Sequence, residues 1–319
     1  GEKLPCPEGR EVGRIISAVR AKKDYCDYLV EQSEYRFEGL RIVLDCAHGS
    51  ASFIAKEVFE RLGAEVIAKS CAPDGININD HCGSTHPERL QEMVVNYGAD
   101  LGFAFDGDAD RLISCDEYGN IVDGDQAMGI LALHMHSKGT LVKNTLVLTV
   151  MSNLGLKNAL KEAGISIVET KVGDRYVLEN MLANGYSIGG EQSGHIILLA
   201  KNTTGDGMMS ALSLLGVVAE TKKRLSKLAA RIPQYPQVLV NVIVENEKKA
   251  EALADEELSA LTKEIEAKLG KNGRVLIRAS GTEPLVRIMI EGQDEQSILD
   301  QALSLAHIIV RKYNGKIRT

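Results

Sequence analysis

The sequence predicts consecutive mixed α/β domains of the βαβ type, followed by a small α+β domain at the carboxyl end. Up to residue 231, short apolar runs of strand length alternate with stretches of helical periodicity, which is the pattern of βαβ units. Residues 232–236 then contain two prolines, at which a helix must stop. Beyond them the order changes to strand, helix, two alternating strands and helix, which favours an α+β domain over a third βαβ unit.

Each predicted element follows from its local pattern. Residues 11–31 have the apolar spacing of an amphipathic helix, but this stretch has no strand of its own. Gly63 closes one helix and Pro87 opens the next, as these residues commonly do. A turn at residues 118–119 pairs the two short strands that flank it. The predicted strands are 41–47, 65–68, 101–105, 111–114, 120–122, 145–151, 166–170, 186–189, 195–199, 237–244, 274–279 and 285–290, and the further helices are 52–62, 87–97, 126–135, 154–163, 175–183, 255–269 and 294–312.

Composition excludes several classes of protein. The chain has 319 residues, 44% of them hydrophobic, which is enough for ordinary cores in two or three domains. The net charge of −7 argues against a general nucleic-acid surface. No apolar stretch approaches the roughly 20 residues that span a bilayer, so we expect no membrane segment. The six cysteines form no C-x-x-C pair and are expected to be reduced thiols of a cytoplasmic protein.

Three aspartates form the most informative motif of the chain. Asp106, Asp108 and Asp110 alternate directly after the apolar run 101–105. Carboxylates held this close raise one another's pKa unless a positive charge is present. Hard oxygen ligands suit Mg²⁺, with water or a substrate phosphate completing its octahedron. The motif therefore predicts a magnesium site at the end of a strand.

Two other interpretations of this loop explain the sequence less well. An EF-hand would place acids at the same alternating positions, but its sixth position needs a glycine, and here it is Arg111. An EF-hand also needs a preceding helix, whereas the run before this loop is typical of a strand. A solvated acidic turn leaves unexplained why a strand ends abruptly in three acids and an arginine. The metal site is the favoured interpretation.

The loop between the last two predicted strands has the composition of an anion-binding nest. Ser280, Gly281 and Thr282 offer hydroxyl groups and consecutive backbone N–H groups to a phosphate. Arg278 and Arg287 lie at its two rims, where each could add a bidentate contact. A plain polar hairpin turn with two cross-strand arginines fits the composition equally well.

A glycine-rich loop at residues 189–195 carries the groups that suit sugar hydroxyls. Glu191 could accept two hydroxyl hydrogen bonds, Ser193 could donate or accept one, and His195 could bind a phosphate or move a proton. For His195 alone, a structural role is the simpler interpretation. A serine-hydrolase elbow is excluded, because G-x-S-x-G needs a residue between Ser193 and the next glycine. Residues 205–210 lack the third glycine of a dinucleotide fingerprint, so Asp206 is better interpreted as a helix N-cap or a polar group facing the cleft.

The three loops, in this order, resemble those of the α-D-phosphohexomutase superfamily. Residues 106–111 are similar to its metal loop, residues 190–195 to its sugar-binding loop and residues 278–284 to its phosphate-binding loop. The resemblance extends from about residue 37 to the carboxyl end. Within the superfamily, residues 73–79, 82–87 and 171–176 are similar to the bacterial phosphoglucosamine mutase branch.

This resemblance implies an isomerase that interconverts glucosamine 6-phosphate and glucosamine 1-phosphate, a step towards UDP-N-acetylglucosamine and the cell wall. In the superfamily a phosphoserine donates its phosphoryl group, the bisphosphate turns over, and the other phosphate returns to the serine; catalysis is positioning and charge neutralisation. The implied ligands are Asp106, Asp108 and Asp110 for Mg²⁺, with Arg111 supporting the loop; Glu191, Ser193 and His195 for the sugar; and Arg278, Ser280, Gly281, Thr282 and Arg287 for the phosphate.

One family motif has no counterpart in the sequence. The superfamily carries its nucleophilic serine directly before a histidine in a first domain, and none of the seven histidines here follows a serine. The resemblance therefore implies a mutase that lacks its first domain and is inactive alone. It further implies self-association through the surface of residues 37–138 that this domain would cover. A serine-less paralogue that binds a phosphosugar without catalysis, and a phosphomannomutase or phosphoglucomutase, stay open as alternatives.

The expected domains follow from the resemblance. We expect residues 1–36 to be the linker and closing helix of the first domain, 37–140 an α/β metal-binding domain, 141–232 an α/β sugar-binding domain, and 233–319 an α+β phosphate-binding domain. In the superfamily this last domain has a fold like that of the TATA-box-binding protein.

Overall fold

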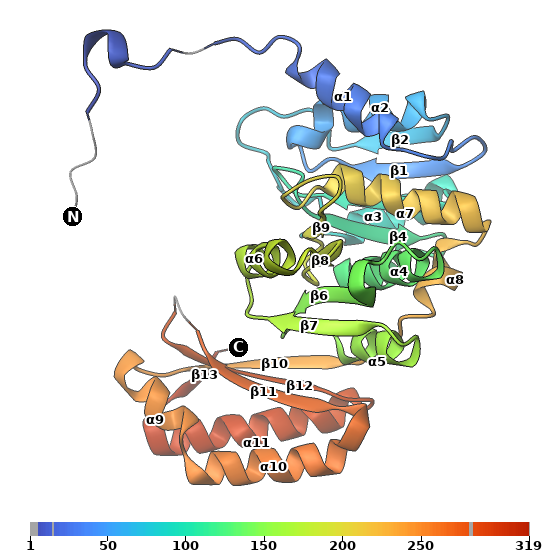
Figure 1. Cartoon of the computed structure of the whole chain (residues 1–319). Helices are drawn as coiled ribbons and strands as arrows, with labels where there is room; N and C mark the ends of the chain where they lie inside the picture. Colours follow the sequence, from blue (N-terminus) through green and yellow to red (C-terminus); the bar gives the residue numbers. More distant parts are fainter. Residues whose placement is uncertain (1–5, 15, 281–282, 319) are drawn as a thin grey trace.

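The computed structural model describes residues 6–14, 16–280 and 283–318. Three β-sheets follow one another along the molecule, each with its own helices (Figure 1). The first two are mixed sheets of α/β units, and the third is antiparallel with its helices on one face. The predicted fold class is confirmed. Within the described residues, every helix is too short or too polar to cross a lipid bilayer.

The first sheet has five strands in the order β2-β1-β3-β4-β5. β1, β2 and β3 run parallel, because helical connections return the chain to the same edge, whereas β4 follows β3 after a short loop and must run antiparallel. This short loop is the acidic loop, so the fold places it at the carboxyl end of β3. The elements are β1 (Arg41–Asp45), β2 (Glu65–Lys69), β3 (Leu101–Phe105), β4 (Leu112–Asp116), β5 (Ile121–Val122), α1 (Ala21–Glu31), α2 (Ala55–Arg61) and α3 (Glu88–Tyr97).

The second sheet repeats this design with four strands in the order β7-β6-β8-β9. β6, β7 and β8 are parallel, and β9 turns back antiparallel to β8 after the glycine-rich loop. The acidic and glycine-rich loops therefore hold equivalent positions in their sheets. The elements are β6 (Thr145–Thr149), β7 (Ser166–Thr170), β8 (Ile188–Gly190), β9 (Ile196–Leu198), α4 (Gly124–Ser137), α5 (Leu154–Glu162), α6 (Asp174–Asn184), α7 (Gly207–Thr221) and α8 (Leu225–Ala229).

Two helices connect these sheets. α4 packs against β4 and β8, and α7 packs against β4 and β9, so each helix touches strands of both sheets. One hydrophobic cluster contains buried residues of both sheets, of which Cys26 is the first along the chain and Ile232 the last. Asp206 is confirmed as the N-cap of α7, since its Oδ1 accepts a hydrogen bond of 2.9 Å from the backbone N–H of Met209.

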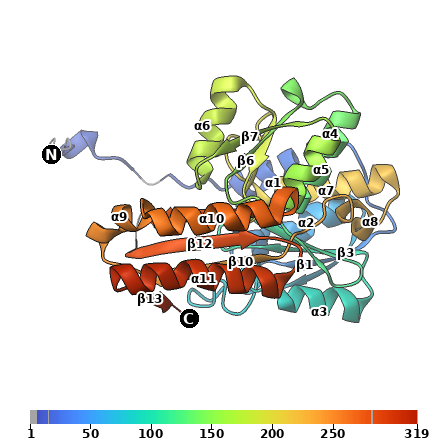
Figure 2. The same cartoon turned by 90° about the horizontal axis from the view of Figure 1, so that it is seen from below.

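The third sheet has the order β11-β12-β10-β13, with every pairing antiparallel. α10 and α11 lie side by side across one face of this sheet (Figure 2), and a separate hydrophobic cluster joins them to it. Its elements are β10 (Gln237–Ile243), β11 (Arg274–Ala279), β12 (Leu285–Glu291), β13 (Lys316–Arg318), α9 (Lys249–Leu253), α10 (Glu256–Leu269) and α11 (Glu295–Tyr313).

The prediction of one helix over residues 11–31 is wrong for its first half. The helix starts at Ala21, and residues 6–14 and 16–20 lead away from the body of the molecule (Figure 1). Ile16 and Val19, both 86% exposed, contact no core, and an isolated amphipathic stretch gains too little from its own hydrogen bonds to stay helical. The helix predicted from residue 52 also begins as a 3₁₀ turn, Ser50–Phe53, before α2. The short elements α8, α9 and β13 were not predicted.

Candidate functional site

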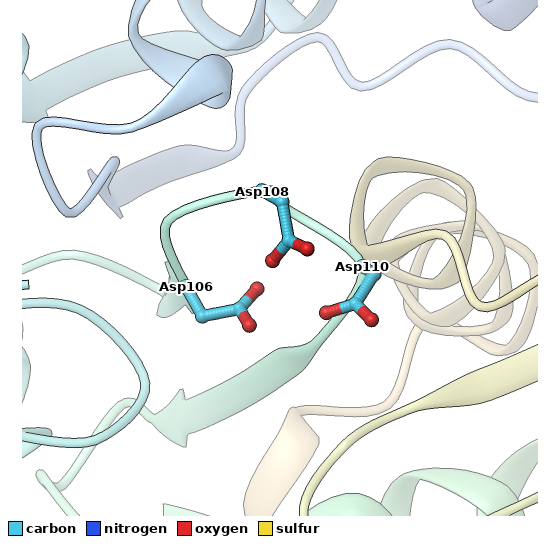
Figure 3. Close-up of side chains that lie close together, drawn as sticks. All are labelled: Asp106, Asp108 and Asp110. Carbon is cyan, nitrogen blue, oxygen red and sulfur yellow. The ribbon is translucent and has the colours of Figure 1, made fainter. Parts of the chain in front are cut away.

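The acidic loop brings its three aspartates together after β3. One carboxylate oxygen from each of Asp106, Asp108 and Asp110 lies within 4.8 Å of the others, and Figure 3 shows the three side chains converging on one point. Asp106 is buried, Asp110 is half-buried and Asp108 is exposed. One side of the cluster thus faces the protein and the other faces solvent, which is the arrangement that an ion with both protein and substrate ligands needs.

Backbone contacts hold the loop in this shape. The Oδ1 atom of Asp106 accepts a hydrogen bond of 3.2 Å from the backbone N–H of Arg111, which closes the loop on itself. Ala109 lies between them in the left-handed region, at φ 61°. The loop is also anchored from outside, since the Gly107 carbonyl accepts from the N–H of Ser50 at 2.9 Å. Backbone contacts alone therefore fix the loop that carries the aspartates.

The electrostatics of the cluster favour a cation. Burial, together with the carboxylates of Asp110 and Asp108, raises the pKa of Asp106 to about 6. Arg111 offers only partial compensation, because its Nε lies 3.6 Å from Asp106 and 3.8 Å from Asp110. The Oδ1 atom of Asp110 is buried without a hydrogen-bond partner. Converging hard oxygens with an unsatisfied buried acceptor fit a divalent cation such as Mg²⁺.

The glycine-rich loop lies directly against the acidic loop. The backbone N–H of Leu112, at the start of β4, donates to the Gly194 carbonyl at 3.0 Å, and Arg111 forms an isolated β-bridge with His195. The imidazole Nε2 of His195 lies 3.4 Å from Oδ2 of Asp110. Gly194 has φ +95°, and a Cβ there would meet the Leu112 carbonyl oxygen at 2.2 Å, so only glycine permits this approach. The fold joins two of the predicted loops into one site.

The polar groups of this loop differ in exposure. His195 is only 4% exposed, and its Nδ1 is buried without a partner. Glu191 is half-buried, and its Oε1 accepts a hydrogen bond of 2.9 Å from the Gly173 N–H. Ser193 is exposed at the tip of the turn. The loop therefore presents a hydroxyl and part of a carboxylate to solvent while the imidazole is held beside Asp110.

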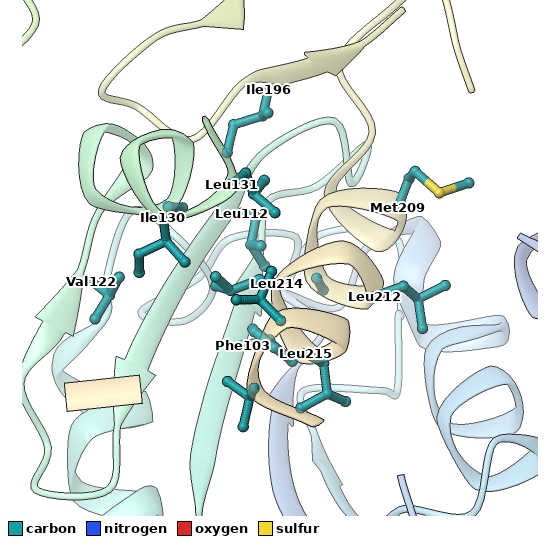
Figure 4. Packing of buried hydrophobic residues seen from close by; sticks show 14 of the residues in the cluster. Phe103, Leu112, Val122, Ile130, Leu131, Ile196, Met209, Leu212, Leu214 and Leu215 are labelled. Carbon is teal, nitrogen blue, oxygen red and sulfur yellow. The ribbon is translucent and has the colours of Figure 1, made fainter. Parts of the chain in front are cut away.

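A shared core fixes the relative position of the two loops. Figure 4 shows Leu112 of β4 and Ile196 of β9 in one cluster with side chains of α4 and α7. Both residues are buried, and each directly follows one of the two loops. Displacing one loop from the other would open this core, which makes the junction rigid.

The predicted phosphate loop joins β11 to β12 in the third sheet. Arg278 and Arg287 lie directly opposite each other on these strands. Burial and the neighbouring Arg287 guanidinium lower the pKa of Arg278, as expected for two cations held close together. The carboxylate of Glu283 partly compensates, accepting from Arg287 at 2.7 Å. Ser280 is buried, and Gly281 and Thr282 lie outside the described residues.

Among the described residues, no hydrogen bond or ion pair joins the β11–β12 loop to the acidic or glycine-rich loop. The structure therefore brings two of the three predicted loops into contact and leaves the third separate. Arg278 and Arg287 offer a cationic pair to an anion.

The sequence pattern does not identify several residues that contact the predicted loops. Lys249 of α9 donates to the carbonyl oxygens of Ser280 and Glu283, and Arg318 of β13 pairs with the Glu283 carboxylate at 2.9 Å. Both lie far along the chain from the loop that they hold, and nothing in the local sequence marks them. Asp174 was within a recognised segment but had no assigned role, although its Oδ2 lies 3.8 Å from Nε2 of His195.

Comparisons with known proteins agree with this geometry. Family models of phosphoglucomutase/phosphomannomutase match in order: α/β/α domain II at residues 23–119, α/β/α domain III at 123–235 and the C-terminal domain at 239–308. Among solved structures, a phosphoglucomutase/phosphomannomutase family protein from Burkholderia thailandensis has a TM-score of 0.79 at 23% identity, covering 93% of this chain and 66% of that one. Aspergillus fumigatus N-acetylphosphoglucosamine mutase, in complex with GlcNAc-6P and magnesium, has a TM-score of 0.72 at 20% identity, covering 90% of this chain and 64% of that one. These likenesses show the fold.

Sequence relatives show the family. The chain is 53% identical over 313 residues to the phosphoglucosamine mutase of Caldanaerobacter subterraneus subsp. tengcongensis. It is 52% identical over 312 residues to that of Clostridioides difficile. Each match covers 98% of this chain and 70% of the relative. The chain belongs to the phosphoglucosamine mutase family of the phosphohexomutases.

Proposed function

We propose that this chain forms the metal-, sugar- and phosphate-binding part of a phosphoglucosamine mutase that interconverts glucosamine 6-phosphate and glucosamine 1-phosphate. The family relationship supports this reaction, and the chain spans about 70% of its relatives. The junction between Asp110 and His195 carries the proposal, because three carboxylates that suit a cation lie beside a loop whose polar groups suit a sugar.

The metal role falls to Asp106, Asp108 and Asp110, which would hold Mg²⁺. The bound ion would neutralise charge on a transferring phosphoryl group. Arg111 keeps the loop closed through its backbone contact with Asp106 and adds a second positive charge at its edge. The buried Oδ1 of Asp110, which has no hydrogen-bond partner, supports this assignment.

The sugar role falls to Glu191, Ser193 and His195. A carboxylate and a hydroxyl can accept and donate hydrogen bonds to neighbouring sugar hydroxyls, which orients the ring towards the metal site. Gly173 supports this role by fixing one oxygen of Glu191, so that the other is free for the sugar. His195 holds the sugar loop against the acidic loop.

The phosphate role falls to Arg278, Ser280 and Arg287, with Gly281 and Thr282 as further proposed contacts. Two guanidinium groups at directly opposed strand positions suit the phosphate that is not reacting. A bound phosphate would relieve the repulsion between these arginines and draw Arg287 from Glu283. The loop thus selects for an anion of at least two charges.

Calorimetric titration of the chain with glucosamine 6-phosphate and with mannose 6-phosphate, each with Mg²⁺, tests the proposal. We expect saturable binding that favours the amino sugar. Arg287→Gln is expected to weaken binding about tenfold or more, because it removes a charge-assisted contact. Arg311→Gln is the matched control, an exposed arginine of the same domain that pairs with Glu257. Binding that is absent, or equally affected by both variants, would contradict the proposal.

A further inference from the structure

Asp174 is an exposed carboxylate at the edge of the proposed sugar site. It begins α6, within the segment 171–176, and its side chain is 62% exposed. Its Oδ1 accepts a hydrogen bond of 2.8 Å from the N–H of Arg175, which leaves Oδ2 available. Its only ion-pair partner among the described residues is His195, at 3.8 Å.

The surroundings of Asp174 belong to the sugar loop. The residue before it, Gly173, donates its N–H to Oε1 of Glu191 at 2.9 Å. Asp174 Oδ2 faces the same His195 imidazole edge that lies 3.4 Å from Asp110. The carboxylate of Glu191 is thus hydrogen-bonded to the residue that directly precedes Asp174.

The two cationic side chains near Asp174 in the sequence contact other residues. The Nε of Arg175 pairs with Glu179 at 2.7 Å, one turn along α6. The Lys171 ammonium lies over the ring of Tyr176, 5.9 Å from its centroid. Both positive side chains of this segment therefore have other partners, and among the described residues no lysine or arginine pairs with Asp174.

We infer that Asp174 recognises the amino group of the substrate, its carboxylate pairing with the ammonium on carbon 2 of glucosamine phosphate. This inference rests on the proposed function. Neighbouring substituents of a hexose ring project side by side, so a ring whose hydroxyl is bound by Glu191 presents the next substituent to the adjoining carboxylate. An ammonium forms a charge-assisted hydrogen bond there, whereas the hydroxyl of glucose or mannose forms a weaker neutral–ionic one.

Other carboxylates of the site are less suited to this role. Asp110 converges on the metal position with Asp106 and Asp108. Glu191 already accepts the Gly173 N–H and is the natural hydroxyl acceptor. Asp206 is buried, with its oxygens on the N–H of Met209 and the hydroxyl of Tyr25. Of these four carboxylates, Asp174 is the one that is exposed, has an oxygen without a hydrogen bond and lies near His195.

The test compares glucosamine 6-phosphate with glucose 6-phosphate by calorimetry on the unaltered chain and on Asp174→Asn. Asparagine keeps the shape and the Oδ1 acceptor for Arg175, so it removes the charge alone. Glu264→Gln is the matched control, because it removes an exposed carboxylate of α10 that pairs with Lys268 and leaves the partner of Arg175 in place. We expect Asp174→Asn to weaken glucosamine 6-phosphate binding about five- to tenfold and to leave glucose 6-phosphate binding within about twofold.

The outcomes separate this inference from the proposed function. Unchanged binding of both sugars in Asp174→Asn, or an equal loss for both, would overturn the role of Asp174 while leaving the mutase assignment intact. An equal loss of glucosamine 6-phosphate binding in Glu264→Gln would overturn it as well. Failure of the unaltered chain to bind either sugar phosphate would contradict the proposed function, and the inference would fall with it.

Discussion

The imidazole Nε2 of His195 lies 3.4 Å from the Oδ2 atom of Asp110, which connects the glycine-rich loop of the second sheet to the acidic loop of the first. The residues come from hairpin loops in equivalent positions of two similar sheets. The imidazole is buried, and the glycine-rich loop that carries it is anchored to Leu112. A movement of this loop would therefore also move the aspartates. We therefore expect binding of the metal and binding of the sugar to be coupled.

Gly205→Ala is expected to disturb His195 directly. A Cβ at position 205 would lie 2.3 Å from the imidazole Nε2, so the ring must move. Overpacking of this kind costs about 1–3 kcal/mol, and we expect glucosamine 6-phosphate binding to weaken about tenfold. Thermal unfolding and calorimetry measure the two effects.

Gly216→Ala is the matched control for this change. It lies inside α7, and its added Cβ would meet only the Tyr35 ring, at 3.4 Å. We expect it to stabilise the chain by roughly 0.5–1 kcal/mol, because alanine is the better helix former. Unaltered sugar binding in Gly205→Ala would show that the position of His195 does not matter for the sugar.

Asp125 is expected to make stability depend on pH. It is buried in α4, and burial, followed by the charge of Asp123, raises its pKa from 3.8 to about 7. Between these values the folded chain holds a proton that the unfolded chain releases, so the free energy of unfolding falls as pH rises through this window and is level above it.

Asp125→Asn removes this contribution and keeps an acceptor for the N–H of Asn153. Denaturant unfolding at about pH 5 and about pH 8 measures it. We expect the variant to gain stability relative to the unaltered chain at the higher pH. The same pH dependence in both proteins would contradict the assignment of this titration to Asp125.

Arg274→Met is expected to loosen the third sheet from the second. Arg274 donates to the carbonyls of Val150, at 2.8 Å, and Ser152, at 2.7 Å, and pairs with the fully buried Glu291. Glu291 in turn accepts from the N–H of Leu154. The substitution leaves the buried carboxylate of Glu291 without its cation, which lowers the free energy of unfolding by about 3–5 kcal/mol.

Limited proteolysis at residues 232–236, with denaturant unfolding, measures this loss. Arg278→Met is the control on the same strand, since it relieves repulsion from the directly opposed Arg287 and is expected to leave stability within about 0.5 kcal/mol. Equal protease resistance of Arg274→Met and the unaltered chain would contradict the anchoring role of Arg274.

Local features of this protein could be predicted from its sequence, and long-range ones could not. The strand 101–105 and the acidic loop after it have strong local signals, a continuous apolar run followed by alternating acids, and the structure confirms the strand. The periodicity of residues 11–20 predicts helix where the structure has none, because periodicity does not reveal whether a partner surface exists. α8, α9 and β13 are too short for their periodicity to stand out.

The site itself depends on contacts that no local pattern encodes. The approach of His195 to Asp110, the position of Asp174 beside both, and the hold of Lys249 on the β11–β12 loop all arise from tertiary packing. The resemblance to phosphohexomutases implies that His195 is a sugar ligand, but it does not predict the contact of His195 with Asp110. The roles of the site residues, the domain boundaries, the inactivity of the chain alone and its self-association stay predictions.

A crystal structure of the chain soaked with Mn²⁺ and glucosamine 6-phosphate tests the central proposal most directly, since Mn²⁺ shares the oxygen ligands of Mg²⁺ and has an anomalous signal. We predict one anomalous peak among Asp106, Asp108 and Asp110, with the sugar ring against Glu191 and Ser193 and its phosphate at Arg278 and Arg287. An ion bound elsewhere, or a sugar phosphate that avoids these loops, would contradict the account.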